Sequence, residues 1–374
     1  MNFLKSEREH LERFLPGLDA ELAEQPLQEL EKRGNPCLGM LIAARGAGLL
    51  IPTEYGGLGA TPVEAVRVHR AVATRSPSLS IAMTMHNFSV ATLVEYTFYG
   101  DYTVDLLKSV AENQLLVASG FAEGRTGSSI LDPLMRAEPV DGGYRINGAK
   151  KPCTLTYSMG LLTASVAVPS DNGGAPRRAV AVVPADAEGI DRQPFWTSSV
   201  LGGAESDQLV LKDVFIPQDQ LFFPEVDEGL DAVEAGGFLW FELLVSASYL
   251  GVASALAERA LAGGKGTDGE RVQLAIELES AMSGLEGVAQ TMMTGERGED
   301  ILVRSLLVRF AVQGAIERSV MRAAELLGGM SFIASPDVAY LLSASRALAF
   351  HPPSRLSVAP AIDGFLAGGP MEIA

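Results

Sequence analysis

The spacing of apolar and polar residues changes twice along the chain, near residue 115 and again after residue 222. Before the first change, apolar residues recur every three or four positions, as on one face of a helix. Between the changes, short apolar runs alternate with Gly, Pro and Asp, as in strands joined by turns. The helical spacing then returns. We expect an α+β protein with a helical N-terminal domain (1–114), a middle β-domain (115–222) and a C-terminal helical domain (223–374).

Within these regions the pattern predicts particular elements. Thr61, Pro62 and Glu64 resemble a helix start. Asn147-Gly148 predicts the turn of a β-hairpin. We expect helices over 7–14, 27–48, 62–73, 84–99, 238–262, 271–294, 300–327 and 336–350, and strands over 115–121, 161–168, 179–183 and 209–216.

Residues 238–257 are long and apolar enough to resemble a membrane span of about 20 residues. A carboxylate at Glu242 would be costly in lipid, and no basic loop flanks the segment. We therefore expect a helix buried inside the protein and no membrane contact. Residues 238–257 and the aliphatic helices that follow are too apolar for a solvated surface, so we also expect them to pack in the subunit interface of a homo-oligomer.

Composition and charge narrow the range of functions. The 374 residues include 29 Lys and Arg against 46 Asp and Glu, which gives a net charge of −17. Nucleic acids and anionic membranes attract basic surfaces, so neither is an expected partner. The N-terminal segment is polar, without an apolar signal sequence, and fits a cytoplasmic protein.

Metal and disulfide chemistry are not expected. Cys37 and Cys153 are too few for a disulfide framework or a Cys-rich zinc site. The histidines lack the paired spacing of metal ligands, which favours structural roles. They are His10, His69, His86 and His351.

The loop from Phe121 to Ser129 carries more chemical information. It follows an apolar strand and ends in small residues, whose backbone N–H groups can form a nest for a phosphate or the polar edge of a ring. The hydroxyl of Thr154 is expected at the same end of the β-domain. Each feature alone is more typical of an ordinary loop.

Five short motifs, in order and at similar separations, resemble those of the acyl-CoA dehydrogenase family over nearly the whole chain. They are Ile51-Pro52-Thr53-Glu54-Tyr55-Gly56-Gly57-Leu58-Gly59, Glu123 with Gly127-Ser128, Asn147-Gly148-Ala149-Lys150 followed by Thr154, Asp213-Val214-Phe215-Ile216-Pro217, and Gly328-Gly329. That family has a helical domain, a β-domain and a C-terminal four-helix bundle, in the order expected here. The resemblance implies this fold, FAD as cofactor and oxidation of a CH–CH bond.

The resemblance also implies which residues bind FAD. The residues that match the ring-binding motifs are Phe121, Ala122, Gly127, Ser128 and Thr154, with Thr154 near the N5 edge of the ring. Gly328 and Gly329 would contact the FAD of a neighbouring subunit in a homodimer or homotetramer. The chain departs from the family where Ala122 replaces a Thr, Pro152 replaces a Trp, and residues 263–269 replace the family's R-x-x-F-G motif.

The catalytic base is the sharpest departure. Family members usually carry a Glu that removes the α-proton of the thioester, and alignment on Arg346 places Pro352 there. Other members supply this Glu from the first long C-terminal helix, at the position of Phe241 here. Glu242, in an apolar helix where burial raises a carboxyl pKa, is our first candidate base, and His351 is the second. The alternatives are a Glu242 that pairs with a buried arginine or lies at an interface, and a structural His351.

The leading interpretation is an FAD-dependent oxidoreductase that α,β-dehydrogenates an acyl thioester. The acyl group would be bound to CoA or to an acyl or peptidyl carrier protein, and the electron acceptor stays open. One alternative is a flavin-dependent oxygenase of the same fold. Another is a catalytically degenerate member that serves as a scaffold.

Overall fold

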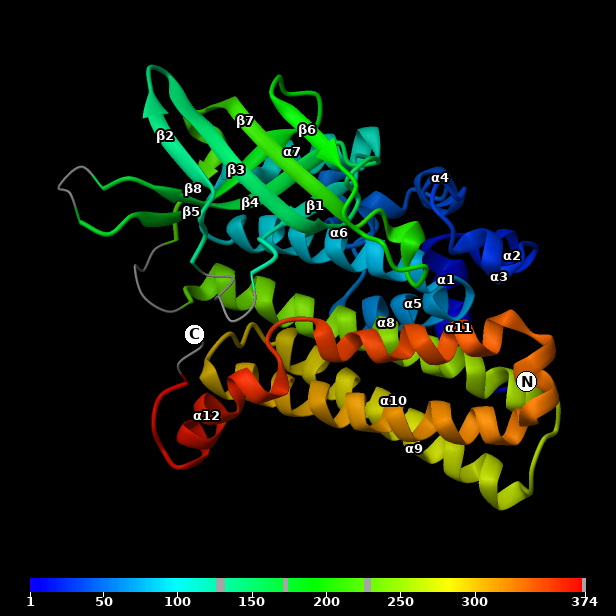
Figure 1. The fold of residues 1–374 in the computed structure, drawn as a ribbon. Helices are drawn as coiled ribbons and strands as arrows, with labels where there is room; N and C mark the ends of the chain where they lie inside the picture. The colour runs from blue at the N-terminus through cyan, green and yellow to red at the C-terminus, as the bar shows by residue number, and fades with distance from the viewer. Residues whose placement is uncertain (126–131, 171–173, 225–229, 372–374) are drawn as a thin grey trace.

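A β-sheet lies across a layer of helices, and a bundle of longer helices lies on the other side of that layer (Figure 1). The computed structural model describes residues 1–125, 132–170, 174–224 and 230–371. Helices from both ends of the chain and strands of the sheet share one large hydrophobic cluster. The predicted α+β class, with helical ends and a central β region, is confirmed.

The N-terminal region is helical. α5 begins with a capping box, in which Thr61 Oγ1 accepts the Glu64 N–H and the Glu64 carboxylate accepts the Thr61 N–H. Pro62 stands at the first helical position, where its missing N–H costs nothing. The elements are α1 (Lys5–Phe14), α2 (Leu18–Ala23), α3 (Leu27–Leu30), α4 (Cys37–Ala43), η1 (Gly46–Gly48), η2 (Thr53–Tyr55), α5 (Pro62–Arg75), α6 (Pro77–Tyr96), η3 (Asp101–Thr103) and α7 (Val104–Asn113).

The single helix predicted over residues 27–48 is wrong. The segment forms α3, α4 and η1, and a turn around Asn35 separates α3 from α4. Gly34 has a φ of +69°, which favours glycine, and Pro36 has no N–H for a continuing helix. Asn35 Oδ1 accepts the Cys37 N–H at 2.8 Å and so satisfies one free donor at the start of α4.

The β region forms one eight-stranded sheet. Its main path runs β6-β7-β3-β2-β4-β5-β8, and β1 pairs with β4 in parallel outside this path. The strands are β1 (Val117–Gly120), β2 (Arg136–Val140), β3 (Gly143–Cys153), β4 (Leu161–Val168), β5 (Arg177–Pro184), β6 (Ile190–Gln193), β7 (Asp207–Pro217) and β8 (Leu221–Phe222), with short turns η4 (Gly202–Ala204) and η5 (Gln218–Gln220).

The hairpin turn predicted at Asn147-Gly148 is also wrong. β3 runs through both residues, and its register with β7 shifts there, as at a bulge. The Asn147 side chain accepts the Asp213 N–H at 2.8 Å and so joins the two strands. The hairpin turn lies earlier, at Asp141-Gly142 between β2 and β3, where Gly142 has a φ of +77°. Both dipeptides carry the same turn signal, and the strand pairing selects between them.

The C-terminal region is a helical bundle. α10 bends at Gly328, which has a φ of +79° and a ψ of 164°. A capping box of Thr267 and Glu270 starts the helix that follows the loop 263–267. The helices are α8 (Ala232–Ala262), α9 (Asp268–Met292), α10 (Glu299–Ala334), α11 (Pro336–Ser345), η6 (Arg346–Phe350) and α12 (Arg355–Leu366).

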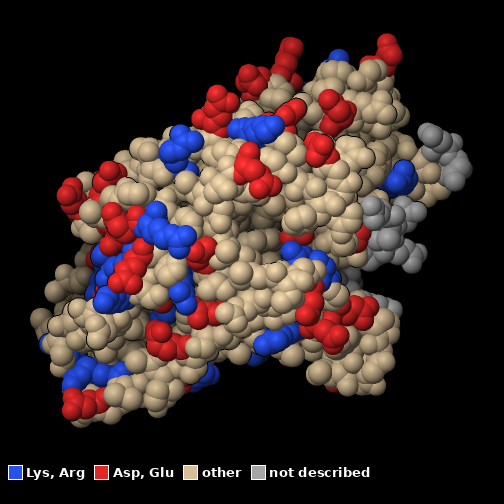
Figure 2. Space-filling view, turned by 180° about the vertical axis from the view of Figure 1, so that it is seen from behind, with Lys and Arg blue, Asp and Glu red and all other residues tan. Residues whose placement is uncertain are grey.

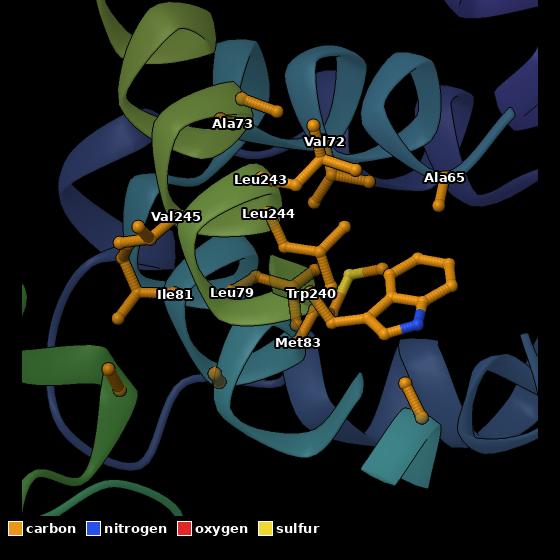
Figure 3. Packing of buried hydrophobic residues seen from close by; sticks show 14 of the residues in the cluster. Ala65, Val72, Ala73, Leu79, Ile81, Met83, Trp240, Leu243, Leu244 and Val245 are labelled. Carbon is orange, nitrogen blue, oxygen red and sulfur yellow. The ribbon is translucent and has the colours of Figure 1, made fainter. Parts of the chain in front are cut away.

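α8 is the central helix of the molecule. Its residues Trp240, Leu243 and Leu244 pack among side chains of α5 and α6 (Figure 3). A Cβ at Gly251 would lie 2.4 Å from the Arg70 carbonyl oxygen, so glycine permits the close approach of α8 to α5. α8 is long and apolar enough to span a membrane, but 94% of its most apolar 18-residue window is buried inside the protein. Its apolar surface therefore forms the core expected for residues 238–257.

His86 of α6 joins the helical layer to the sheet. The Val117 N–H at the start of β1 donates to His86 Nδ1 at 2.9 Å, and His86 Nε2 donates to the Ala47 carbonyl at 2.9 Å. These partners fix a neutral ring with its proton on Nε2, because a backbone N–H cannot accept a hydrogen bond. Burial lowers the pKa of His86 to about 4.

Acidic residues outnumber basic ones in the chain, 46 to 29. Asp and Glu side chains gather along the upper rim of the rear face, and basic side chains on that face lie beside acidic ones (Figure 2). This distribution agrees with the net charge of −17.

Candidate functional site

The loop after β1 and the end of β3 lie side by side. The Lys151 N–H donates to the Ala122 carbonyl at 2.8 Å, and Glu123 and Lys151 form an isolated parallel bridge. The structure therefore places Phe121 and Ala122 at the same end of the sheet as Thr154. Two other residues that the resemblance assigns to the flavin, Gly127 and Ser128, lie outside the described residues.

Glu123 holds this loop in place. Its carboxylate accepts hydrogen bonds from Lys150 Nζ at 2.8 Å and from the Leu134 and Met135 N–H groups at 2.9–3.0 Å. Burial alone would raise the pKa of Glu123, but these hydrogen bonds, with Lys150 first among them, hold it below its ordinary value. Glu123 is thus an ionised structural clamp between the loop and the strands.

Two hydroxyls lie at the end of β3. Thr154 Oγ1 and Ser206 Oγ are 2.9 Å apart, and both residues are buried. One hydrogen bond uses one O–H hydrogen, so the pair retains a second hydrogen for a further acceptor. The edge of a flavin ring carries nitrogen and carbonyl acceptors. The donors present here therefore fit the ring that the resemblance implies.

A row of aromatic rings leads from this loop into the helical layer. The ring centroids of Phe121 and Phe88 of α6 are 6.2 Å apart. Phe88 packs edge-on against Phe241 of α8, with their ring centroids 5.4 Å apart. The centroid of the His351 ring is 6.1 Å from that of Phe241 and 5.5 Å from that of Tyr249. The three phenylalanines are half-buried. The row thus provides an apolar, water-poor wall between the sheet end and His351.

Glu242 forms an ion pair with a buried arginine, Arg309, which is one of the structural alternatives to a catalytic base. Both of its oxygens accept hydrogen bonds from Arg309 Nη1 at 2.7 Å, and each side chain is 1% exposed. Burial raises the pKa of Glu242, and the attraction of Arg309 opposes that rise. The base role of Glu242 stays a prediction, and this geometry favours a structural one.

His351 lies just beyond η6 at the end of the aromatic row. Its Nε2 is 2.9 Å from the Tyr249 hydroxyl. Tyr249 is fully buried, and in the part of the chain that the structure describes its hydroxyl has no other acceptor, so the O–H donates to Nε2 and leaves Nε2 without a proton. Within the described residues, His351 Nδ1 has no hydrogen-bond partner, so the ring offers an Nδ1–H. Burial first, and the nearby Arg309 charge second, lower the pKa of His351 to about 3.

Gly328 and Gly329 precede His351 by more than 20 residues in the sequence. They lie near the end of α10, and α11 and η6 run between them and His351. Gly328 supplies the positive φ at the bend of α10. The predicted contact of these glycines with a neighbouring subunit's FAD stays a prediction.

Sequence reasoning missed several residues of this site. Arg309 pairs with Glu242 from 67 positions away, and Phe88 and Tyr249 stand in helices with no motif around them. One signal existed: Glu242 and Arg309 are each a charge inside an apolar helical run, and such charges are usually paired. Within the described ranges, no group of three or more His, Cys, Asp or Glu residues could bind a metal ion.

Comparison with known proteins places the chain among oxidoreductases. A search of protein-family models finds no match. The chain is 45% identical over 379 aligned positions, covering 100% of both chains, to the isobutylamine N-hydroxylase of Streptomyces viridifaciens. FMN-bound TdsC from Paenibacillus sp. A11-2 matches 100% of this chain and 99% of its own with a TM-score of 0.79 and 18% identity. XiaF from a Streptomyces species, in complex with FADH2 and glycerol, matches 99% and 97% with a TM-score of 0.79 and 16% identity.

The structural likenesses show the acyl-CoA dehydrogenase-like fold, as the sequence motifs predict. The identity over the whole of both chains shows the family: the protein belongs to that of isobutylamine N-hydroxylase, within this fold. Membership of the acyl-CoA dehydrogenases proper is not confirmed.

Proposed function

We propose that the protein is a flavin-dependent monooxygenase that hydroxylates the nitrogen of a small primary amine. The observation that carries this proposal is the 45% identity, over the full length of both chains, with a protein named isobutylamine N-hydroxylase. It favours the oxygenase alternative over α,β-dehydrogenation of an acyl thioester.

The site agrees with this reaction. Hydroxylation of an amine removes no α-proton, so the reaction needs no carboxylate in the place taken by Pro352. One oxygen atom of O2 joins the amine nitrogen and the other leaves as water, and bound reduced flavin supplies the two electrons. Glu242 is neutralised by Arg309 and is not required as a base.

The residues of the chain have separate tasks in this proposal. Thr154 and Ser206 bind and orient the ring edge through the free hydroxyl hydrogen of the pair. Phe88, Phe121 and Phe241 exclude water from the reacting atoms. His351, whose pKa is about 3, stays neutral at physiological pH and keeps a proton on Nδ1, from which it donates a hydrogen bond.

The flavin itself is expected to be FAD, although the sequence lacks the family's usual adenosine-binding motif. Thr154→Val removes one hydroxyl without a large change in shape. One lost hydrogen bond is worth about 1 kcal/mol, so we expect flavin affinity to fall roughly fivefold. Fluorescence titration with FAD and FMN measures this loss and identifies the preferred flavin. Thr163→Val, on buried β4, is the matched control; an unchanged affinity in Thr154→Val would contradict this assignment.

The test of the reaction is product analysis. The purified protein is supplied with FAD or FMN, a flavin-reducing system, O2 and isobutylamine, and the hydroxylamine is quantified by mass spectrometry. We expect hydroxylamine that depends on protein and flavin together. A protein that binds flavin, forms no hydroxylamine from primary amines, and is reduced anaerobically by acyl thioesters would return the dehydrogenase interpretation.

Two expectations from the sequence remain predictions. The first is a homo-oligomer. The apolar helix 238–257 does not supply its interface, because α8 is buried within the chain, but exposed apolar side chains near the end of α10 offer a surface: Met330, Phe332 and Ile333. The second is a carrier protein as partner, which the amine reaction does not require.

A further inference from the structure

Arg309 joins two parts of the chain that meet at His351. Its Nη1 donates to both oxygens of Glu242 at 2.7 Å and to the Pro352 carbonyl at 3.2 Å. Its Nη2 donates to the His351 carbonyl at 2.6 Å and to the Leu348 carbonyl at 3.3 Å. One buried guanidinium thus binds three carbonyls of the turn that carries His351, and it is the donor to two of them, those of His351 and Pro352; the Leu348 carbonyl also accepts the His351 N–H at 3.3 Å.

The sequence of this turn explains why it needs such a donor. Pro352 and Pro353 follow His351, and proline has no N–H. The turn therefore has few backbone donors of its own: the His351 N–H serves the Leu348 carbonyl, and Arg309 serves the partly buried carbonyls of His351 and Pro352. The planar guanidinium, with five N–H donors, can serve several acceptors at once.

α8 supports the same turn twice. Glu242 and Tyr249 are seven residues apart, which is two helical turns, so both lie on the face of α8 toward His351. Glu242 orients the guanidinium that binds the backbone of the turn, and the Tyr249 hydroxyl binds the ring. Glu242 also neutralises Arg309, which permits a guanidinium to be buried beside a functional histidine.

We propose that Glu242 and Arg309 are positioning residues, which together with Tyr249 fix His351 in one orientation and one tautomer, with Nδ1–H directed at the reacting atoms. The role of the ring toward an amine rests on the proposed function. The orientation and the tautomer do not, because they follow from contacts within the chain.

The tautomer can be measured in flavin-free protein. Nitrogen-15 spectra of protein labelled at histidine distinguish a protonated from an unprotonated ring nitrogen. The chain has four histidines, so His351→Asn assigns the signal. In the wild type we expect an unprotonated Nε2 and a protonated Nδ1 for His351. In Tyr249→Phe, which removes only the hydroxyl, we expect the two tautomers to exchange.

Glu242→Gln tests the positioning pair itself. We expect the His351 signals to move toward the exchanging values of Tyr249→Phe. Glu95→Gln is the matched control, because Arg297 binds both Glu95 oxygens and also the Met292 and Glu296 carbonyls, in an arrangement without His351. Wild-type His351 signals in Glu242→Gln, or equal changes in the control, would overturn the proposal.

A double-mutant cycle extends the test to the reaction. Misplacement of about 1 Å can cost on the order of 10²-fold, so we expect a kcat/KM loss of up to this size for amine hydroxylation in Glu242→Gln. In a His351→Ala background the same substitution should have almost no further effect, whereas Glu95→Gln should act independently of His351. If Glu242→Gln lowers kcat/KM by the same factor in the wild type and in the His351→Ala background, Glu242 does not act through His351. If no amine is hydroxylated at all, the proposed function fails, and the tautomer measurement still decides the positioning role.

Discussion

Replacing Arg309 with methionine is expected to lower the free energy of unfolding by about 3–5 kcal/mol, because it leaves the Glu242 carboxylate buried without a partner. Both side chains of the pair are 1% exposed, so water cannot replace the lost hydrogen bonds. The His351 and Pro352 carbonyls lose their Arg309 donor as well, whereas the Leu348 carbonyl keeps the His351 N–H. Urea unfolding at constant pH, followed by circular dichroism, measures the change.

The double variant Glu242→Leu with Arg309→Met provides the control. Apolar residues of similar size often replace a buried ion pair with little loss of stability. We therefore expect the double variant to recover most of the stability that Arg309→Met loses. It should not recover the fixed tautomer of His351, because the turn still lacks its donor. A double variant as unstable as the single one would show that the carbonyl contacts, rather than the unpaired charge, dominate the free energy.

His86→Gln is expected to make the protein less sensitive to acid. The pKa of His86 is about 4 in the folded chain against 6.5 for an ordinary histidine, so the unfolded chain binds more protons between these values. Stability is therefore lost as the pH falls from about 6.5 toward 4, and each pKa unit corresponds to about 1.4 kcal/mol. A Gln side chain can accept from Val117 and donate to Ala47 without titrating.

The measurement compares the free energies of unfolding of the wild type and His86→Gln at pH 7.5 and 4.5. The variant should be less stable at pH 7.5. We expect the difference in free energy of unfolding between wild type and variant to shrink by roughly 2–3 kcal/mol at pH 4.5. Buried groups that do not interact with His86 titrate alike in both proteins and cancel in the difference; the exception is His69, whose pKa is lowered by burial and, to a smaller extent, by His86. His10→Gln, at a half-buried position, is the substitution control that leaves His86 and its two partners unchanged. If the difference in free energy of unfolding between wild type and His86→Gln does not change with pH, His86 is not a buried neutral ring with a lowered pKa.

The order of helices, strands and helices could be predicted from apolar spacing, and the motifs gave the fold. Turns were harder. Asn147-Gly148 and Asp141-Gly142 carry the same local signal, and only pairing with β7 decides which one becomes the bulge. Pro36 marks the break in the helix predicted over 27–48. Local spacing therefore predicts element type well, and long-range pairing sets the boundaries.

The candidate site shows the same division. Phe121, Ala122 and Thr154 could be placed together because motifs identify them, and the structure brings them to one end of the sheet. The environment of Glu242 could not be predicted, since a charge in an apolar helix is compatible with a base or with an ion pair. The position of Arg309, 67 residues away, distinguishes these roles, and only packing of α8 against α10 reveals it.

The most direct test of the central claim is the fate of oxygen atoms. The protein, reduced flavin and isobutylamine are mixed under ¹⁸O2 in ordinary water, and the mass of the product is measured. N-hydroxylation predicts one ¹⁸O atom on nitrogen in the hydroxylamine, with none incorporated when the label is in the water instead. Hydroxylamine that carries oxygen from water, or oxygen consumption that yields only hydrogen peroxide at every amine concentration, would contradict it.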